Sequence, residues 1–152
     1  MSKLLDKPRL ASMDYRVVEP LGTGAGSTTL LIADRTRGGA RFALKVVNRQ
    51  DADDDIYIAQ AQTEFAVSKL LSHPNIVKIY DYRVKKRWFR VAKVELLMEY
   101  VEGKPLDEVE MPEIGQLVLI FLEVRHEFHE KNLVKNRVES RFMFKVQRLK
   151  LF

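Results

Sequence analysis

Apolar and polar positions alternate along the first third of the chain in a way that predicts β-strands. Strand-like runs cover residues 15–21, 28–35 and 41–49, and Gly38 and Gly39 stand between the second run and the third. Because two consecutive glycines favour a tight reversal, we expect these two runs to form an antiparallel hairpin.

The next segment changes from alternation to a helical composition. The acidic stretch at residues 50–55 favours the N-terminal end of a helix, since carboxylates are stabilised by the positive end of the helix dipole. We expect the helix to cover residues 58–72, because Pro74 opposes its continuation.

Two further strand-like runs follow, at residues 76–84 and 89–101, on either side of a basic turn at residues 85–88. Beyond Gly103, apolar residues recur at spacings of three and four, which predicts a helix with one apolar face. They are Leu117, Ile120, Phe121, Val124 and Phe128. The predicted fold class is α+β: a five-stranded antiparallel sheet with one helix inserted after the third strand, then a helical segment and a short C-terminal tail.

Composition limits the chemistry that the chain can carry. Its 152 residues are 46% hydrophobic, which suits one domain of ordinary size or one lobe of a larger domain. The sequence contains no cysteine, so a disulfide framework and a thiolate metal site are both excluded, and its three histidines have no companion cluster.

The formal net charge is +5, and the basic excess lies in residues 125–152. Clustered lysine and arginine attract nucleic acid, but no recognised nucleic-acid motif accompanies them, so we expect no nucleic-acid partner. Residues 1–13 contain no signal-peptide core, and no later run approaches membrane-spanning length. We therefore expect a cytoplasmic protein without a membrane partner.

Three glycines follow the first strand-like run in "LGTGAGSTTL", residues 21–30. Glycines let backbone N–H groups approach a phosphate closely, but they also serve a simple turn. A dinucleotide-binding fingerprint would begin a helix here, whereas residues 28–32 favour a strand, and the Gly-Lys-Ser/Thr of a Walker loop is absent.

A glycine loop between two antiparallel strands, followed by "FALK" on the third strand, resembles the small lobe of protein kinases, in particular bacterial-type serine/threonine kinases. In that family the lysine, here Lys45, pairs with the α- and β-phosphates of ATP and with a helix glutamate, here Glu64. "LLMEYVEGKPL" looks like the family's hinge, with Met98 as gatekeeper. The resemblance covers residues 15 to about 106.

The resemblance implies an ATP pocket. Leu21, Thr29 and Ala43 would roof it, and the backbone of residues 99–101 would offer hydrogen bonds to adenine. One departure is local, because the family's third glycine falls at Ser27. The residues expected to contact the nucleotide are Leu21, Gly22, Gly24, Gly26, Ser27, Thr29, Ala43, Lys45, Glu64, Met98, Glu99 and Val101.

The resemblance fails in the catalytic loop. Aligned with the family's pattern, Arg137 occupies the position of the catalytic aspartate and Phe142 that of the magnesium-binding asparagine. Arginine cannot accept the proton of a substrate hydroxyl, and phenylalanine offers no oxygen to Mg²⁺. We therefore expect no catalytic residue and no protein metal ligand, although Mg²⁺ could accompany ATP.

This comparison divides the chain into an N-terminal extension (1–14), a kinase-like small lobe with its hinge (15–106), and a truncated start of a large lobe with a basic tail (107–152). Three hypotheses remain: an ATP-binding pseudokinase or interaction module, a phosphotransferase active only when completed by another chain, and a truncation product without function. An isolated small lobe would expose the surface that faces the large lobe, so a protein partner covering that surface is expected.

Overall fold

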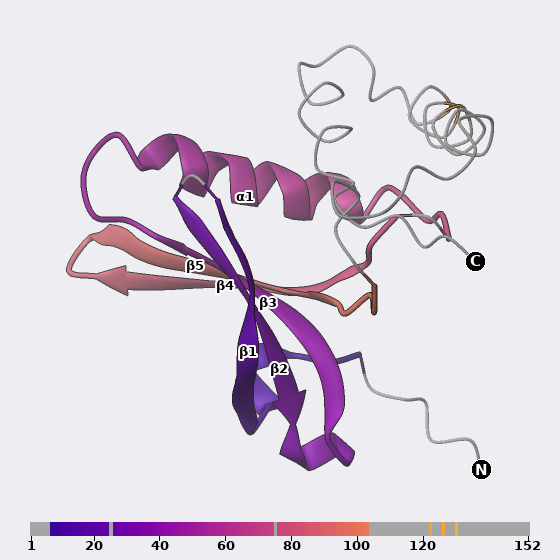
Figure 1. The fold of residues 1–152 in the computed structure, drawn as a ribbon. Helices are drawn as coiled ribbons and strands as arrows, with labels where there is room; N and C mark the ends of the chain where they lie inside the picture. Colours follow the sequence, from indigo (N-terminus) through magenta and orange to yellow (C-terminus); the bar gives the residue numbers. More distant parts are fainter. Residues whose placement is uncertain are drawn as a thin grey trace. The chain divides into compact units, whose positions relative to one another are not determined.

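The computed structural model describes residues 7–24, 26–74 and 76–103, together with Leu122, His126 and Glu130 (Figure 1). Contacts divide the chain into two units. The first contains residues up to 65 and residues 78–100, and it holds the whole sheet. The second contains residues 66–77 and those from Val101 onward.

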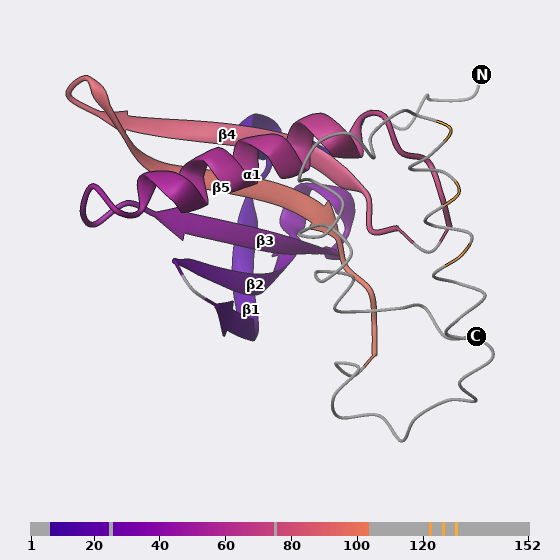
Figure 2. The same ribbon diagram turned by 90° about the horizontal axis from the view of Figure 1, so that it is seen from above.

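Five antiparallel strands form one sheet in the order β1-β2-β3-β5-β4. The strands are β1 (Tyr15–Gly24), β2 (Ser27–Asp34), β3 (Ala40–Asn48), β4 (Ile79–Arg87) and β5 (Arg90–Glu99). Helix α1 (Asp55–Ser68) connects β3 to β4, and Figure 2 shows it lying along the sheet. The α+β architecture and the helix after the third strand are therefore confirmed.

The reversal between β2 and β3 is the predicted hairpin, with a short 3₁₀ turn, η2 (Arg35–Arg37), inserted in it. The buried carboxylate of Asp34 accepts hydrogen bonds from the N–H and the hydroxyl of Thr36, at 2.9 and 2.7 Å. Gly38 and Gly39 then adopt φ values of +65° and +83°, which glycine tolerates without a side-chain clash.

Helix α1 begins at Asp55, the last residue of the acidic stretch and three residues before the predicted start, and it ends at Ser68 rather than at residue 72. The N–H of Leu70 donates to the carbonyl of Val67 at 2.9 Å. This three-residue spacing is tighter than that of an α-helix, so the chain leaves the helix one turn before the expected end.

The basic turn was placed too early by the sequence pattern. Strand β4 continues through the basic residues to Arg87, which pairs directly with Arg90 of β5, so Trp88 and Phe89 alone form the turn. β5 also ends at Glu99, two residues before the predicted limit. A two-residue loop is the commonest connection between antiparallel strands.

Two core clusters lie on opposite faces of the sheet, because successive residues of a strand point to opposite faces. One cluster contains Val47 of β3 and Val94 and Leu96 of β5, packed with Ile58 and Ala61 of α1. The rings of Phe65 and Tyr82 stack beside it, with centroids 5.1 Å apart. This packing fixes α1 against the sheet.

The other cluster includes a residue of the segment before β1. Leu10, in the 3₁₀ helix η1 (Leu10–Ser12), is 2% exposed and packs with Ile32, Leu44 and Leu97. Its N–H donates to Oδ2 of Asp81 at 2.8 Å. Part of the predicted N-terminal extension thus belongs to the core of the first unit.

The helix expected around residues 117–128 falls mostly outside the described residues. Leu122, His126 and Glu130, spaced by four, are helical. Within the described part of the chain, no helix is long and apolar enough to cross a membrane.

Candidate functional site

Sheet register places five of the predicted site residues in two neighbouring rows. One row runs across four strands through Gly22, Thr29, Lys45 and Leu96, and the other runs across three strands through Leu31, Ala43 and Met98. Directly opposite residues of paired strands share a face. Leu96 and Met98 pack in the cluster that includes α1, so both rows lie on the α1 face of the sheet.

Lys45 and Glu64 form an ion pair on this face. Lys45 Nζ lies 2.6 Å from Glu64 Oε2, and the side chains are only 10% and 12% exposed. A buried ammonium is costly without a nearby carboxylate, so each residue needs the other. The pairing that the kinase resemblance implied is confirmed.

Helix periodicity explains why Glu64 reaches the lysine. Ala61 and Phe65 pack on the sheet, and Glu64 lies three residues after Ala61 on the same side of α1. Lys45 comes from the middle of β3, where Thr29 of β2 and Leu96 of β5 flank it. The ion pair therefore depends on the same packing that fixes α1.

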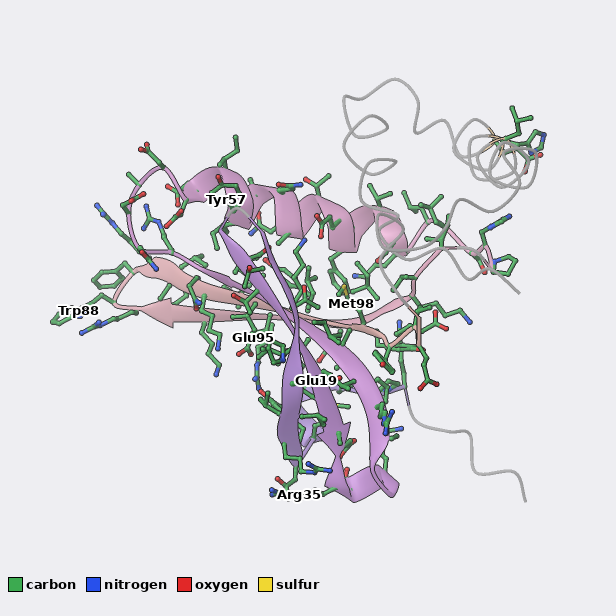
Figure 3. All side chains as sticks on the ribbon, viewed as in Figure 1. Glu19, Arg35, Tyr57, Trp88, Glu95 and Met98 are labelled. Atoms are coloured by element: carbon green, nitrogen blue, oxygen red, sulfur yellow. The ribbon has the colours of Figure 1, made fainter. Side chains whose placement is uncertain are left out.

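The glycine loop is the tight tip of the β1–β2 hairpin. Gly24 pairs with Ser27, so two residues make the turn, and Gly26 has a φ of +68°. A β-carbon added to Gly26 would lie 2.3 Å from Cδ2 of Tyr57. Glycine at this position is thus required both by the backbone torsion and by the close approach of the tip to α1 (Figure 3).

Tyr57 was missed by the sequence reasoning, although a signal for it exists. It precedes Glu64 by seven residues, which is close to two helical turns, so both side chains lie on one side of α1. One face of the helix therefore contacts the loop tip through Tyr57 and the β3 lysine through Glu64.

Register shifts interrupt the β1–β2 pairing on the approach to the loop. Partners pass from Pro20 to Gly22 without a partner for Leu21, which is half-buried. A bulge of this kind increases the local twist of a strand and re-aims its side chains. Gly22 and Gly24, which follow the bulge, are exposed.

At the predicted hinge, part of the backbone is engaged within the protein. The N–H of Glu99 donates to the carbonyl of Lys78 at 2.8 Å, and the Glu99 side chain accepts from the Lys78 N–H at 3.3 Å. Met98 is half-buried in the α1 cluster. Val101 belongs to the second unit and is 7% exposed. Arg137 and Phe142 lie outside the described residues.

A second charge cluster lies on the opposite face of the sheet. Glu95 is 1% exposed, and its Oε2 accepts a hydrogen bond from Arg83 Nε at 2.7 Å. Lys93 Nζ and Lys85 Nζ lie 2.8 and 3.6 Å from its Oε1. Burial acts to raise the pKa of Glu95, but hydrogen bonds from Lys93 and Arg83 and their positive charges outweigh it. The pKa is therefore lower than the ordinary value.

Comparison with known proteins agrees with this geometry. The protein kinase domain family matches residues 15–134. Serine/threonine-protein kinase PknA of Mycobacterium tuberculosis is 30% identical over 105 residues, which cover 69% of this chain and 24% of that protein. A probable serine/threonine-protein kinase PknB of Bifidobacterium longum is 31% identical over 104 residues, covering 66% and 15%.

A probable myosin light chain kinase of Dictyostelium discoideum is 29% identical over 93 residues, covering 61% of this chain and 26% of that protein. The chain thus spans about a quarter or less of the length of these curated relatives. The family match nevertheless includes the glycine loop, the Lys45–Glu64 pair and the segment through Val101. The chain belongs to the protein kinase domain family.

Proposed function

We propose that this chain binds ATP through the α1 face of its sheet and does not transfer phosphate by itself. The observation that carries the proposal is the ion pair between Lys45 and Glu64. Lys45 lies in one row of the sheet with Thr29 and Gly22. Glu64 orients the Lys45 ammonium on a largely buried surface. Such a cation, beside a glycine loop, is suited to hold the α- and β-phosphates of ATP.

The remaining contacts follow from the row geometry. Ala43 and Met98, opposite each other on β3 and β5, offer a small and a flexible apolar side chain to the adenine ring. The Glu99 N–H is engaged by Lys78, so other backbone groups of residues 99–101 would bind the base. Mg²⁺ would arrive with the phosphates. We propose the cytoplasm as the compartment, since ATP is abundant there.

The absence of autonomous transfer rests on two residues. Arg137 and Phe142 stand where the family's catalytic aspartate and magnesium-binding asparagine fall. Neither side chain accepts a proton or ligates Mg²⁺ at neutral pH. On this proposal the chain is a pseudokinase or interaction module, and a protein partner covers the surface that faces the large lobe in complete kinases.

A second candidate is a phosphotransferase that another chain completes. The assembled Lys45–Glu64 pair favours it, because kinases need this pair in place for activity. A radiolabelled phosphate-transfer assay on a basic protein substrate distinguishes the two when a cell extract is added that can supply the completing chain. The first proposal predicts equal background for the chain and its Lys45→Met variant, whereas activity that depends on Lys45 would support the second.

Binding itself is tested by thermal unfolding in a titration with millimolar Mg·ATP. A ligand selective for the native state raises the unfolding midpoint, by an amount equivalent to about 2.7 kcal/mol at a hundred times its Kd. We expect a midpoint that keeps rising with nucleotide concentration for the wild-type chain and for Lys86→Met, a substitution at an exposed lysine of β4. Lys45→Met should show a much smaller rise. The absence of any rise at millimolar ATP would reject nucleotide binding.

A further inference from the structure

A cleft of about 430 Å³ opens at one end of the sheet, away from the Lys45 row. One wall is the β4–β5 hairpin tip, and the other is the connection from β3 to α1. A hydrogen bond from the Arg49 N–H to the Ala92 carbonyl, at 2.9 Å, holds the two walls together at the base. The side chains that matter here are Arg49, Asp51, Arg87, Trp88, Phe89 and Arg90.

The hairpin tip presents two large apolar side chains to solvent. Trp88 is 87% exposed and Phe89 is 96% exposed, and Figure 3 shows Trp88 at the outer end of the hairpin. Trp88 also has a φ of +59°, the sole left-handed value among the non-glycine residues that the structure describes. Hairpin turns with this backbone favour glycine at that position, so a tryptophan here is strained as well as exposed.

Two positive charges at the β4–β5 hairpin tip also destabilise the chain when no ligand is bound. Arg87 and Arg90 are direct cross-strand partners, and like charges in that position repel. Lys85 and Lys93 are also partners, but they share Glu95. Within residues 7–24, 26–74 and 76–103, no carboxylate forms an ion pair with Arg87 or Arg90. The two guanidinium groups are therefore available to an anionic ligand.

The facing wall has the opposite charge. Asp51, Asp53 and Asp54 lie in the β3–α1 connection, where Asp54 Oδ2 accepts from the Gln50 N–H at 2.7 Å. Arg49 is held on this side, with Nη2 donating to Asp55 Oδ2 at 2.9 Å. A continuous anionic surface, such as a membrane or a nucleic acid, would meet these aspartates. A short peptide can place its carboxylates at the arginines alone.

We propose that this cleft docks an acidic peptide segment of a partner protein, with an apolar side chain against Trp88 and Phe89 and carboxylates on Arg87 and Arg90. Tryptophan and arginine are the residues that most often dominate binding energy at protein interfaces. Arginine binds a carboxylate through two parallel N–H groups. The site is separate from the ATP proposal and does not depend on it.

The test selects a displayed library of random short peptides on the full chain. We expect enriched sequences to combine Asp or Glu with an aromatic or large aliphatic residue. Trp88 is the chain's single tryptophan, so a synthetic copy of an enriched peptide should shift its fluorescence emission on binding. The Arg87→Glu/Arg90→Glu variant should lose at least about tenfold in affinity, as expected for paired charges at an interface.

Controls separate docking from net charge and from folding. Arg16→Glu/Arg41→Glu changes the net charge equally at two exposed strand residues and should bind as the wild type does. Trp88→Gly suits the left-handed backbone, so it should fold well and yet lose the peptide in a calorimetric titration. Failure to enrich acidic peptides, or equal binding by the Arg87→Glu/Arg90→Glu variant, overturns the proposal. So does a Trp88 response to phosphatidylserine vesicles or an oligonucleotide but not to peptide.

Discussion

Gly26 and Tyr57 meet so closely that a β-carbon on the glycine would lie 2.3 Å from Cδ2 of the tyrosine ring. This approach joins the tip of the β1–β2 hairpin to the first turns of α1, the helix that also carries Glu64. The position of the glycine loop and the orientation of Lys45 are therefore set by one element. A shift of α1 would disturb both together.

Gly26→Ala should destabilise the fold by more than the left-handed backbone alone explains. That backbone costs a non-glycine residue about 1–3 kcal/mol, and the contact with Tyr57 adds to it. Gly38→Ala is the matched control, because Gly38 has nearly the same φ, +65°, with no atom within 4 Å of an added β-carbon. Denaturant unfolding of both variants measures the difference.

Tyr57→Ala tests the same contact from the other side. Alone it should destabilise the chain, because Tyr57 packs in the α1 cluster. Combined with Gly26→Ala, it removes the atoms that clash, so the loss in the double variant should be smaller than the sum of the two single losses. Strictly additive losses would show that the ring and the loop tip do not interact.

Removing one partner of the Lys45–Glu64 pair should lower the free energy of unfolding more than replacing both partners with apolar side chains. Glu64→Leu leaves the Lys45 ammonium largely buried without its carboxylate, a change worth about 3 kcal/mol. Lys45→Met/Glu64→Leu replaces both charges with apolar groups and should recover most of that loss. Chemical denaturation of the single and double variants gives the comparison. A double variant less stable than Glu64→Leu would contradict the ion pair.

Much of this site could be predicted from the sequence because its residues are tied to local patterns. Alternation located the strands, and the spacing of Lys45 and Glu64 within a family pattern identified their pairing, which the structure confirms. Leu10 was missed because a contact between elements distant in sequence leaves no periodic signal. Tyr57 was missed although its seven-residue spacing from Glu64 places both side chains on one side of α1. The turn at Trp88 was misplaced because its basic residues resemble a loop, although they continue both strands.

We expect the segment before β1 to stabilise the fold through Leu10. It is 2% exposed in the cluster with Ile32 and Leu97, so Leu10→Ala should cost about 2–5 kcal/mol. Leu70→Ala removes the same atoms from a side chain that is 52% exposed and should cost much less. Equal losses in thermal or denaturant unfolding would show that the segment does not pack on the sheet.

We expect the free energy of unfolding to fall in acid because Glu95 becomes protonated. Its pKa in the folded chain lies below the ordinary value of 4.5, so ionised Glu95 stabilises the fold at neutral pH. That contribution should be fully present above about pH 5 and should disappear as the pH falls through the lowered pKa. Glu95→Gln should flatten the pH dependence of the unfolding free energy below that value, whereas exposed Glu19→Gln should leave it unchanged.

Calorimetric titration of the full chain with Mg·ATP tests the claim that the Lys45 row binds ATP. We expect saturable binding of one nucleotide per chain. Lys45→Met should abolish this binding, and Lys86→Met should retain it. Absence of saturation at millimolar nucleotide, or equal binding by the Lys45→Met variant, would contradict the claim.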